Sequence, residues 1–119
     1  MGLRTKEMDE KYKTAIANGV LKHDCALCTK DTIKSFKYWK AIRNDFPYDS
    51  IAEVHDMIIP YRHTTWQELS KEELEELERI KEEYLQLTYD YIMEGTNKIK
   101  TIPTHFHLHL IIVKRNESA

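Results

Sequence analysis

The most regular hydrophobic pattern in the chain lies between residues 70 and 95. Large apolar residues recur there at the spacing of one helix face: Leu74, Leu77, Ile80, Tyr84, Leu87 and Tyr91. Ser70 and Glu73 fit a capping box, and Gly95 suits the position after a helix C-terminus. The pattern predicts one long helix from about 71 to about 94, with its glutamate-rich face in solvent.

A shorter amphipathic helix is predicted over residues 5–17. Its apolar face contains Met8, Tyr12 and Ile16. Thr5 suits the N-cap position, and Asn18 followed by Gly19 is typical of a helix end.

The remaining periodic segments predict β-strands. Residues 32–43 alternate in part, and residues 53–59 are expected to form a second strand that Pro60 ends. The segment 44–49 between them has turn chemistry, and a final strand is expected over 104–113. Strands on both sides of a long helix, without a βαβ rhythm, predict an α+β domain with a mainly antiparallel sheet.

The final strand carries an unusual histidine pattern. His105, His107 and His109 alternate with Phe106, Leu108 and Leu110. In a strand the three imidazoles share one face, roughly 6–7 Å apart, and the apolar residues pack against the long helix from the other. Three interpretations follow: a polar strand face that happens to be histidine, a metal site, or catalysis by a neutral imidazole acting as a nucleophile at phosphorus.

Composition restricts the possible partners. The 119 residues suit a single domain, 1–119, and the net charge of −2 gives no electrostatic reason to expect nucleic acid or an anionic membrane as a partner. The apolar runs are too short for a membrane span, and the N-terminus lacks the apolar core of a signal peptide. We therefore expect a cytoplasmic protein. In such a compartment, Cys25 and Cys28 at CxxC spacing favour metal or redox chemistry over a structural disulfide.

Four segments together resemble the histidine triad (HIT) family. The stretch HFHLHLI, from His105, resembles the family's His-φ-His-φ-His-φ-φ signature, and CALC resembles the CxxC of many bacterial members. Asn44 to Pro47 resembles the segment that approaches the nucleotide. His55 to His63 resembles the stretch H-φ-φ-φ-φ-P-K-R-H, with Tyr61 at the usual lysine. The resemblance covers residues 24–115 and implies a HIT-like fold.

The resemblance also implies nucleotidyl transfer through a covalent nucleotidyl-histidine. By position His107 is the nucleophile, His109 holds phosphate oxygens or orients the site, and His105 assists the leaving group or binds metal. Asn44 joins these three histidines as a nucleotide-binding residue. The implied substrates are nucleoside phosphoramidates or nucleoside polyphosphates. Side-chain chemistry agrees with the choice of His107, whose Nδ1–H needs an acceptor such as a backbone carbonyl so that the lone pair lies on Nε2.

In HIT relatives with CxxC, two cysteines and two histidines hold a structural zinc. Carried over, that ligand set is Cys25, Cys28, His63 and His105, which would give closed tetrahedral coordination. His23 is a weaker competing ligand, and no organic cofactor is expected. His55 is expected to be a structural or site-lining residue of the second strand. The resemblance further implies a homodimer.

One segment departs from the family pattern. HIT proteins carry a Gly-Gln-Ser/Thr loop before the triad, whereas residues 95–104 lack it and contain Pro103, which has no backbone donor. The alternative phosphate contacts there are Lys98, Lys100, Thr101 and Thr104. The departure motivates a second hypothesis, a zinc-stabilised nucleotide-binding protein with little or no turnover. A third is a metalloprotein in which the histidines serve throughout as ligands.

Overall fold

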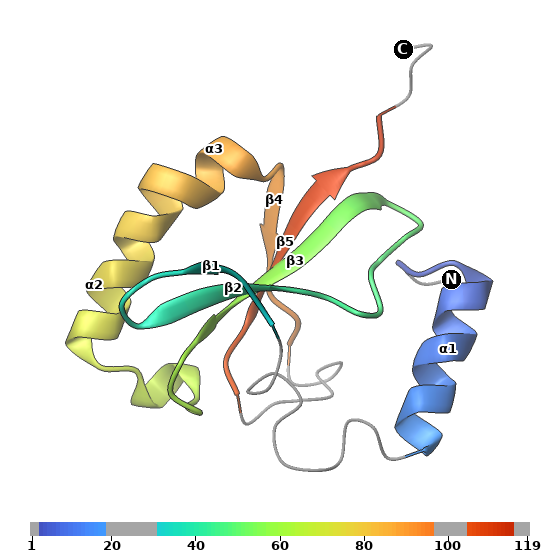
Figure 1. The fold of residues 1–119 in the computed structure, drawn as a ribbon, viewed down its shortest axis with the longest axis horizontal. Coiled ribbons are helices and arrows are strands. Elements are labelled where there is room, and N and C mark those ends of the chain that lie inside the picture. Colours follow the sequence, from blue (N-terminus) through green and yellow to red (C-terminus); the bar gives the residue numbers. More distant parts are fainter. Residues whose placement is uncertain (1–2, 19–30, 97–104, 116–119) are drawn as a thin grey trace.

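The computed structural model describes residues 3–18, 31–96 and 105–115 (Figure 1). The helical elements are α1 (Lys6–Ala17), η2 (Trp66–Glu68), α2 (Lys71–Ile80), η3 (Lys81–Leu85) and α3 (Gln86–Thr88). The strands are β1 (Thr32–Ser35), β2 (Trp39–Arg43), β3 (Ala52–Pro60), β4 (Tyr91–Met93) and β5 (Leu108–Val113). Within the described residues the fold is α+β, as predicted.

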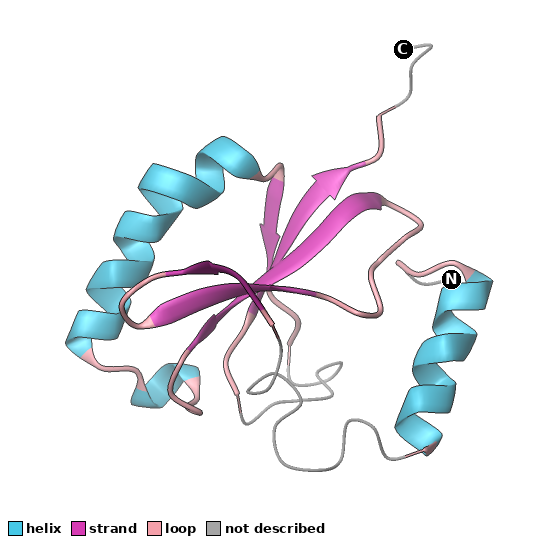
Figure 2. Cartoon of the chain, viewed as in Figure 1, coloured by secondary structure: helices cyan, strands magenta, loops and turns pink. Residues whose placement is uncertain are grey.

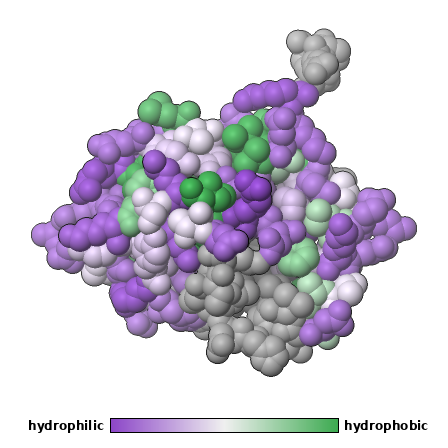
Figure 3. All heavy atoms as spheres, viewed as in Figure 1, coloured by the Kyte–Doolittle hydropathy of each residue, from purple (hydrophilic) through white to green (hydrophobic). Residues whose placement is uncertain are grey.

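The described strands form a five-stranded antiparallel sheet in the order β1-β2-β3-β5-β4. In Figures 1 and 2, α2 and α1 lie at opposite ends of the molecule with the strands between them. The main hydrophobic core lies where α2 meets the sheet. Its largest fully buried members include Trp39, Ile58, Leu77, Leu85 and Leu110. The face of the molecule drawn in Figure 3 is mostly hydrophilic, with a few separate hydrophobic patches.

The predicted long helix begins where expected but ends early. Both halves of the capping box between Ser70 and Glu73 are present. The α-helix ends at Ile80, continues as a π-helical turn and a short α3, and the chain then turns into β4. Leu87 is 81% exposed, and Tyr91 lies in β4 opposite Ile111 rather than on a helix. The prediction of a helix to residue 94 was wrong because sheet pairing satisfies the backbone of these last residues.

Two glutamates of α2 are buried, contrary to the expected solvent-facing role of the acidic face. Glu76 is 8% exposed, and its carboxylate accepts hydrogen bonds from the backbone amides of Lys37 and Tyr38 at 3.2 and 2.6 Å. Glu73 is 4% exposed, and its backbone carbonyl accepts a 2.8 Å bond from the Trp39 indole. These bonds attach α2 to the β1–β2 hairpin and satisfy groups that burial would otherwise penalise. The remaining glutamates of the segment are exposed.

The predicted strands also need two corrections. The segment 32–43 is two strands, β1 and β2, joined by a turn in which the Phe36 amide donates to the Trp39 carbonyl at 2.8 Å. The prediction for residues 53–59 is confirmed by β3, and α1 with its Thr5 N-cap confirms the N-terminal helix.

The final strand begins at Leu108 rather than near residue 104, so His105 and His107 precede it. In the register that pairs Ile58 with Leu108, Phe106 would stand opposite Pro60. Proline has no backbone donor, so the ladder cannot continue there. The Phe106 amide donates instead to the Thr64 carbonyl at 2.7 Å.

No helix among the described residues combines the length and apolar character that crossing a membrane requires.

Leu77 and Leu87 both belong to the predicted apolar stripe, but only Leu77 is buried in the structure, so replacing each in turn tests the observed core. We expect Leu77→Ala to lower the free energy of unfolding by about 2–5 kcal/mol because it leaves a cavity at a fully buried site. Leu87→Ala should change it by less than about 0.5 kcal/mol because that side chain is exposed. Urea denaturation of both variants gives the measurement, and equal losses would contradict the observed burial of Leu77 and exposure of Leu87.

Candidate functional site

The histidine segment alternates as the sequence predicts. Phe106, Leu108 and Leu110 belong to the core cluster that includes residues of α2. His105, His107 and His109 are also buried, with 1%, 8% and 7% of their surfaces exposed. Imidazoles buried to this degree need defined hydrogen-bond partners, and these partners determine what each ring can do.

His107 has its proton placed by the backbone. Its Nδ1 lies 3.0 Å from the carbonyl oxygen of His105, and a carbonyl can only accept. Nδ1–H therefore donates, and in the neutral ring the lone pair lies on Nε2. The ring centroid lies 5.2 Å from that of His109, at an interplanar angle of 83°. This is the arrangement that a nucleophilic Nε2 requires.

His55 is neutral and has one tautomer. The backbone amide of Tyr48 donates to its Nδ1 at 2.9 Å, so that nitrogen must carry a lone pair. Burial, and secondarily the positive charge of Arg4, lower the pKa of His55 to about 4. The proton of the neutral ring therefore lies on Nε2.

This tautomer determines that of His109. His55 Nε2 lies 2.8 Å from His109 Nδ1. His55 pairs with Ile111, and His109 precedes Ile111 by two residues on β5, so the rings of His55 and His109 are diagonal neighbours on one face of the sheet. His55 Nε2–H donates, so His109 accepts at Nδ1 and, when neutral, carries its own proton on Nε2. His109 thus provides an N–H donor beside the lone pair of His107, a combination suited to a phosphoryl group.

Asn44, predicted to bind nucleotide, lies in the same cluster. Its Oδ1 accepts from the Phe46 amide at 2.8 Å, which fixes the orientation of the side-chain amide. Its Nδ2 lies 3.3 Å from His55 Nε2 and 3.9 Å from Met57 Sδ. His55 Nε2–H donates to His109 Nδ1 at 2.8 Å, the shorter of the two distances. Asn44 Nδ2 also carries only hydrogens, so its approach to His55 Nε2 is a packing contact and not a hydrogen bond.

The wall of this cluster comes from the β2–β3 connection and the N-terminal helix. Thr5 binds Asp49 through its backbone amide at 2.6 Å and its hydroxyl at 2.8 Å. Arg4 Nε donates to the Phe46 carbonyl at 2.8 Å, and its guanidinium lies over the ring of Tyr48 at 4.9 Å. These contacts hold α1 against the connection that carries Tyr48.

Sequence reasoning missed the parts played by Arg4 and Tyr48, whereas it expected His55 as a structural or site-lining residue of the second strand. Arg4 carries no local signal, and Tyr48 comes directly after the segment Asn44 to Pro47, where the resemblance to the family's nucleotide-approaching stretch ends. His55 was assigned to the second strand, which is correct, but its bond to His109 depends on strand register. The pairing of β3 with β5 brings His55 to His109.

A second pair of histidines lies at the other end of the triad segment. The ring centroids of His63 and His105 are 4.9 Å apart. His105 Nε2 lies 3.0 Å from the Pro60 carbonyl, so Nε2–H donates and the lone pair lies on Nδ1. Burial lowers the pKa of His105, with smaller contributions from His63, His107 and Lys40, which favours the neutral, ligating form.

The other predicted zinc ligands, Cys25 and Cys28, lie outside the described residues, as does His23. Within the described ranges, no group of three or more His, Cys, Asp or Glu side chains could hold a metal ion. The two histidines nevertheless fit half of a Cys₂His₂ set, because they adjoin each other and one is oriented by a carbonyl behind it.

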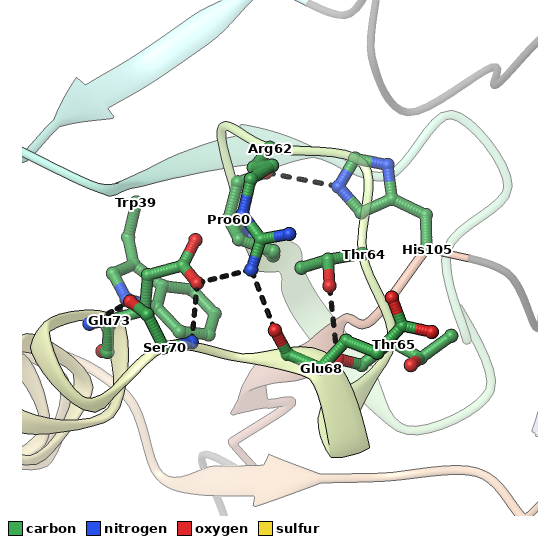
Figure 4. A network of polar contacts seen from close by, with 9 residues as sticks. All are labelled: Trp39, Pro60, Arg62, Thr64, Thr65, Glu68, Ser70, Glu73 and His105. Atoms are coloured by element: carbon green, nitrogen blue, oxygen red, sulfur yellow. Dashed lines mark hydrogen bonds and ion pairs between the residues drawn. The ribbon is translucent and has the colours of Figure 1, made fainter.

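Polar contacts hold the connection after β3, which contains His63, and Figure 4 shows these contacts together with His105. Arg62 Nη2 donates to the Glu68 carbonyl at 2.8 Å and forms a 2.7 Å ion pair with Glu73. Glu73 Oε1 also accepts from the Ser70 amide at 2.8 Å. Pro60 and Arg62 flank the turn that leads to His63, so these bonds attach that turn to the start of α2.

The loop candidates for phosphate contact, Lys98, Lys100, Thr101 and Thr104, lie outside the described residues. The chain matches no protein-family model and no curated protein, so its function is inferred from the histidine pattern and the geometry above.

The lowered pKa of His55 predicts acid sensitivity. The unfolded chain binds a proton near pH 6.5 and the folded chain only near pH 4, so this group's stabilisation is present above pH 6.5 and is lost as the pH falls toward 4. Between pH 7.5 and pH 5 the loss should be about 2 kcal/mol.

Urea denaturation of the parent and of His55→Gln at these two pH values tests this prediction. The variant should lose less stability than the parent on acidification, even if it is less stable at both pH values. An unchanged pH dependence would show that His55 is not the neutral member of the pair.

Proposed function

We propose that this protein is a HIT-type nucleotidyl hydrolase or transferase. Its substrates would be nucleoside phosphoramidates, nucleoside polyphosphates or similar nucleotidyl compounds. The supporting sequence features are the HFHLHLI stretch, the CxxC pair and the His55 to His63 segment. The same resemblance leads us to propose a homodimer, and the composition of the chain leads us to propose a cytoplasmic protein.

The hydrogen bond from His107 Nδ1–H to the His105 carbonyl is the observation that carries this proposal. It places the lone pair on Nε2 without requiring a carboxylate to orient the ring. A histidine held in this way attacks phosphorus as a neutral nucleophile, and the next residue on the same face provides a donor.

The reaction then has two displacements at the α-phosphorus. In the first, Nε2 of His107 forms a bond to phosphorus, the bond to the leaving group breaks, and the leaving group departs with a proton from solvent. In the second, a water oxygen bonds to phosphorus and releases a proton to solvent, and the P–N bond breaks with its electron pair returning to His107 Nε2, which yields the nucleoside monophosphate. The Nε2–H of His109 donates to a phosphoryl oxygen, and His55 maintains that donor by occupying Nδ1.

We further propose a structural zinc held by Cys25, Cys28, His63 and His105. The proximity of the two histidine rings and the carbonyl behind His105 support it. Such a metal would link the N-terminal half of the chain to the histidine segment, whereas His107 and His109 serve the reaction.

Removing the nucleophile should abolish turnover. We expect His107→Gly to lose roughly a thousandfold or more of the phosphoramidase activity, since it removes the nitrogen that forms the covalent intermediate. The measurement is hydrolysis of adenosine phosphoramidate and diadenosine polyphosphate, with mass spectrometry of the acid-quenched parent to detect nucleotidylated His107.

A rescue experiment separates this role from a structural one. The 5′-phosphoimidazolide of adenosine supplies the missing imidazole on the substrate, so His107→Gly should hydrolyse it while remaining inactive on the phosphoramidate. Nucleotide binding by the parent without turnover or an adduct would favour the non-enzymatic alternative.

The zinc proposal predicts one zinc per chain by elemental analysis. Cys25→Ser should release the metal and lower the thermal midpoint by on the order of 5 °C or more, because bound metal stabilises only the folded state. His107→Ala serves as the matched control and should retain zinc. Zinc that survives Cys25→Ser but not His107→Ala would indicate a histidine metal site instead.

A further inference from the structure

Tyr48 lies beside the histidines, and the proposed reaction does not yet explain its position. Its hydroxyl oxygen lies 3.4 Å from His109 Nε2, the nitrogen that carries the proton. Its ring lies against both members of the hydrogen-bonded pair His55 and His109, with centroids 4.4 Å from His55 and 5.1 Å from His109. The phenol is therefore next to the donor that a phosphoryl oxygen would use.

The ring is held in place from several directions. The Tyr48 amide donates to His55 Nδ1 at 2.9 Å, so backbone and ring both contact the same histidine. The Arg4 guanidinium lies 4.9 Å from the ring centroid and is itself tied to the Phe46 carbonyl. A side chain fixed in this way loses little conformational entropy when a ligand binds.

The hydroxyl has the chemistry of an anion ligand. Burial raises the pKa of Tyr48 above its ordinary value, so the phenol keeps its proton and can donate. Its contact with His109 is at the long end of the hydrogen-bond range and is therefore a weak one to exchange for a charged acceptor. The positive charge of Arg4 beside the ring further favours an anion there.

We propose that the Tyr48 hydroxyl binds a phosphoryl oxygen of the nucleotide beside His109. This rests on the proposed function and deepens it. The chain lacks the Gly-Gln-Ser loop that the family resemblance leads one to expect, and Tyr48 supplies a phosphate donor from the β2–β3 connection instead. When the ligand binds, His109 Nε2–H and the phenolic O–H both donate to the phosphoryl group in place of their contact with each other.

The test is calorimetric titration of each common nucleoside monophosphate and its matching nucleoside into the parent and Tyr48→Phe. The substitution keeps the ring and its packing but removes the donor. Monophosphate binding should weaken about tenfold, the usual effect of losing a hydrogen bond to a charged group, while nucleoside binding should change less than about twofold. Tyr12→Phe is the matched control, because that ring also lies over Arg4, at 4.0 Å.

Tyr48→Phe binding the monophosphate as tightly as the parent would overturn the proposal, and so would equal weakening for monophosphate and nucleoside. A parent that binds no monophosphate would overturn it as well. Failure of the enzymatic function would appear separately, as a parent that binds nucleotides but neither turns them over nor forms a His107 adduct. In that case the comparison of Tyr48→Phe with Tyr12→Phe still decides the role of the hydroxyl.

Discussion

The antiparallel pairing of β3 with β5 is the constraint on which the rest of the site depends. It joins segments more than fifty residues apart in the chain and places His55 and His109 on one face of the sheet. A slip of one residue would move every side chain of β5 to the opposite face. The core prevents such a slip, since Leu108 and Leu110 are buried against α2 only in this register.

Within this frame, hydrogen bonds that can run in only one direction decide the state of each imidazole. The Tyr48 amide must donate and the His105 carbonyl must accept, because backbone groups have no alternative roles. The bond from the Tyr48 amide fixes the proton position of His55 and, through it, that of His109. The bond to the His105 carbonyl fixes the proton position of His107. The lone pair of His107 and the N–H donor of His109 thus come to lie side by side.

Two sets of polar contacts outside the sheet hold the connections that carry His63 and Tyr48. The turn after Pro60 is attached to α2 through Arg62 and Glu73, which positions the His63 and His105 rings next to each other. At the opposite end, α1 is attached through Thr5 to the connection that carries Tyr48. Thr5 and Asp49 lie 44 positions apart in the chain, and Arg62 and Glu73 lie 11 positions apart, so neither set of contacts follows from the residue spacing within a single element.

The amino-acid sequence by itself determined the α+β class, α1, the course of β3, the start of α2 and the alternation of histidines with core residues, because each depends on local periodicity, capping or proline. It placed the end of the long helix wrongly and missed the division of residues 32–43, because pairing of β4 with β5 and of β1 with β2 outweighs helical spacing and strand propensity. Only the tertiary structure decided which nitrogen of each histidine carries a proton, since that depends on groups brought together by register. It also brought Tyr48 to His109, a contact across sixty-one positions of sequence that no local pattern encodes.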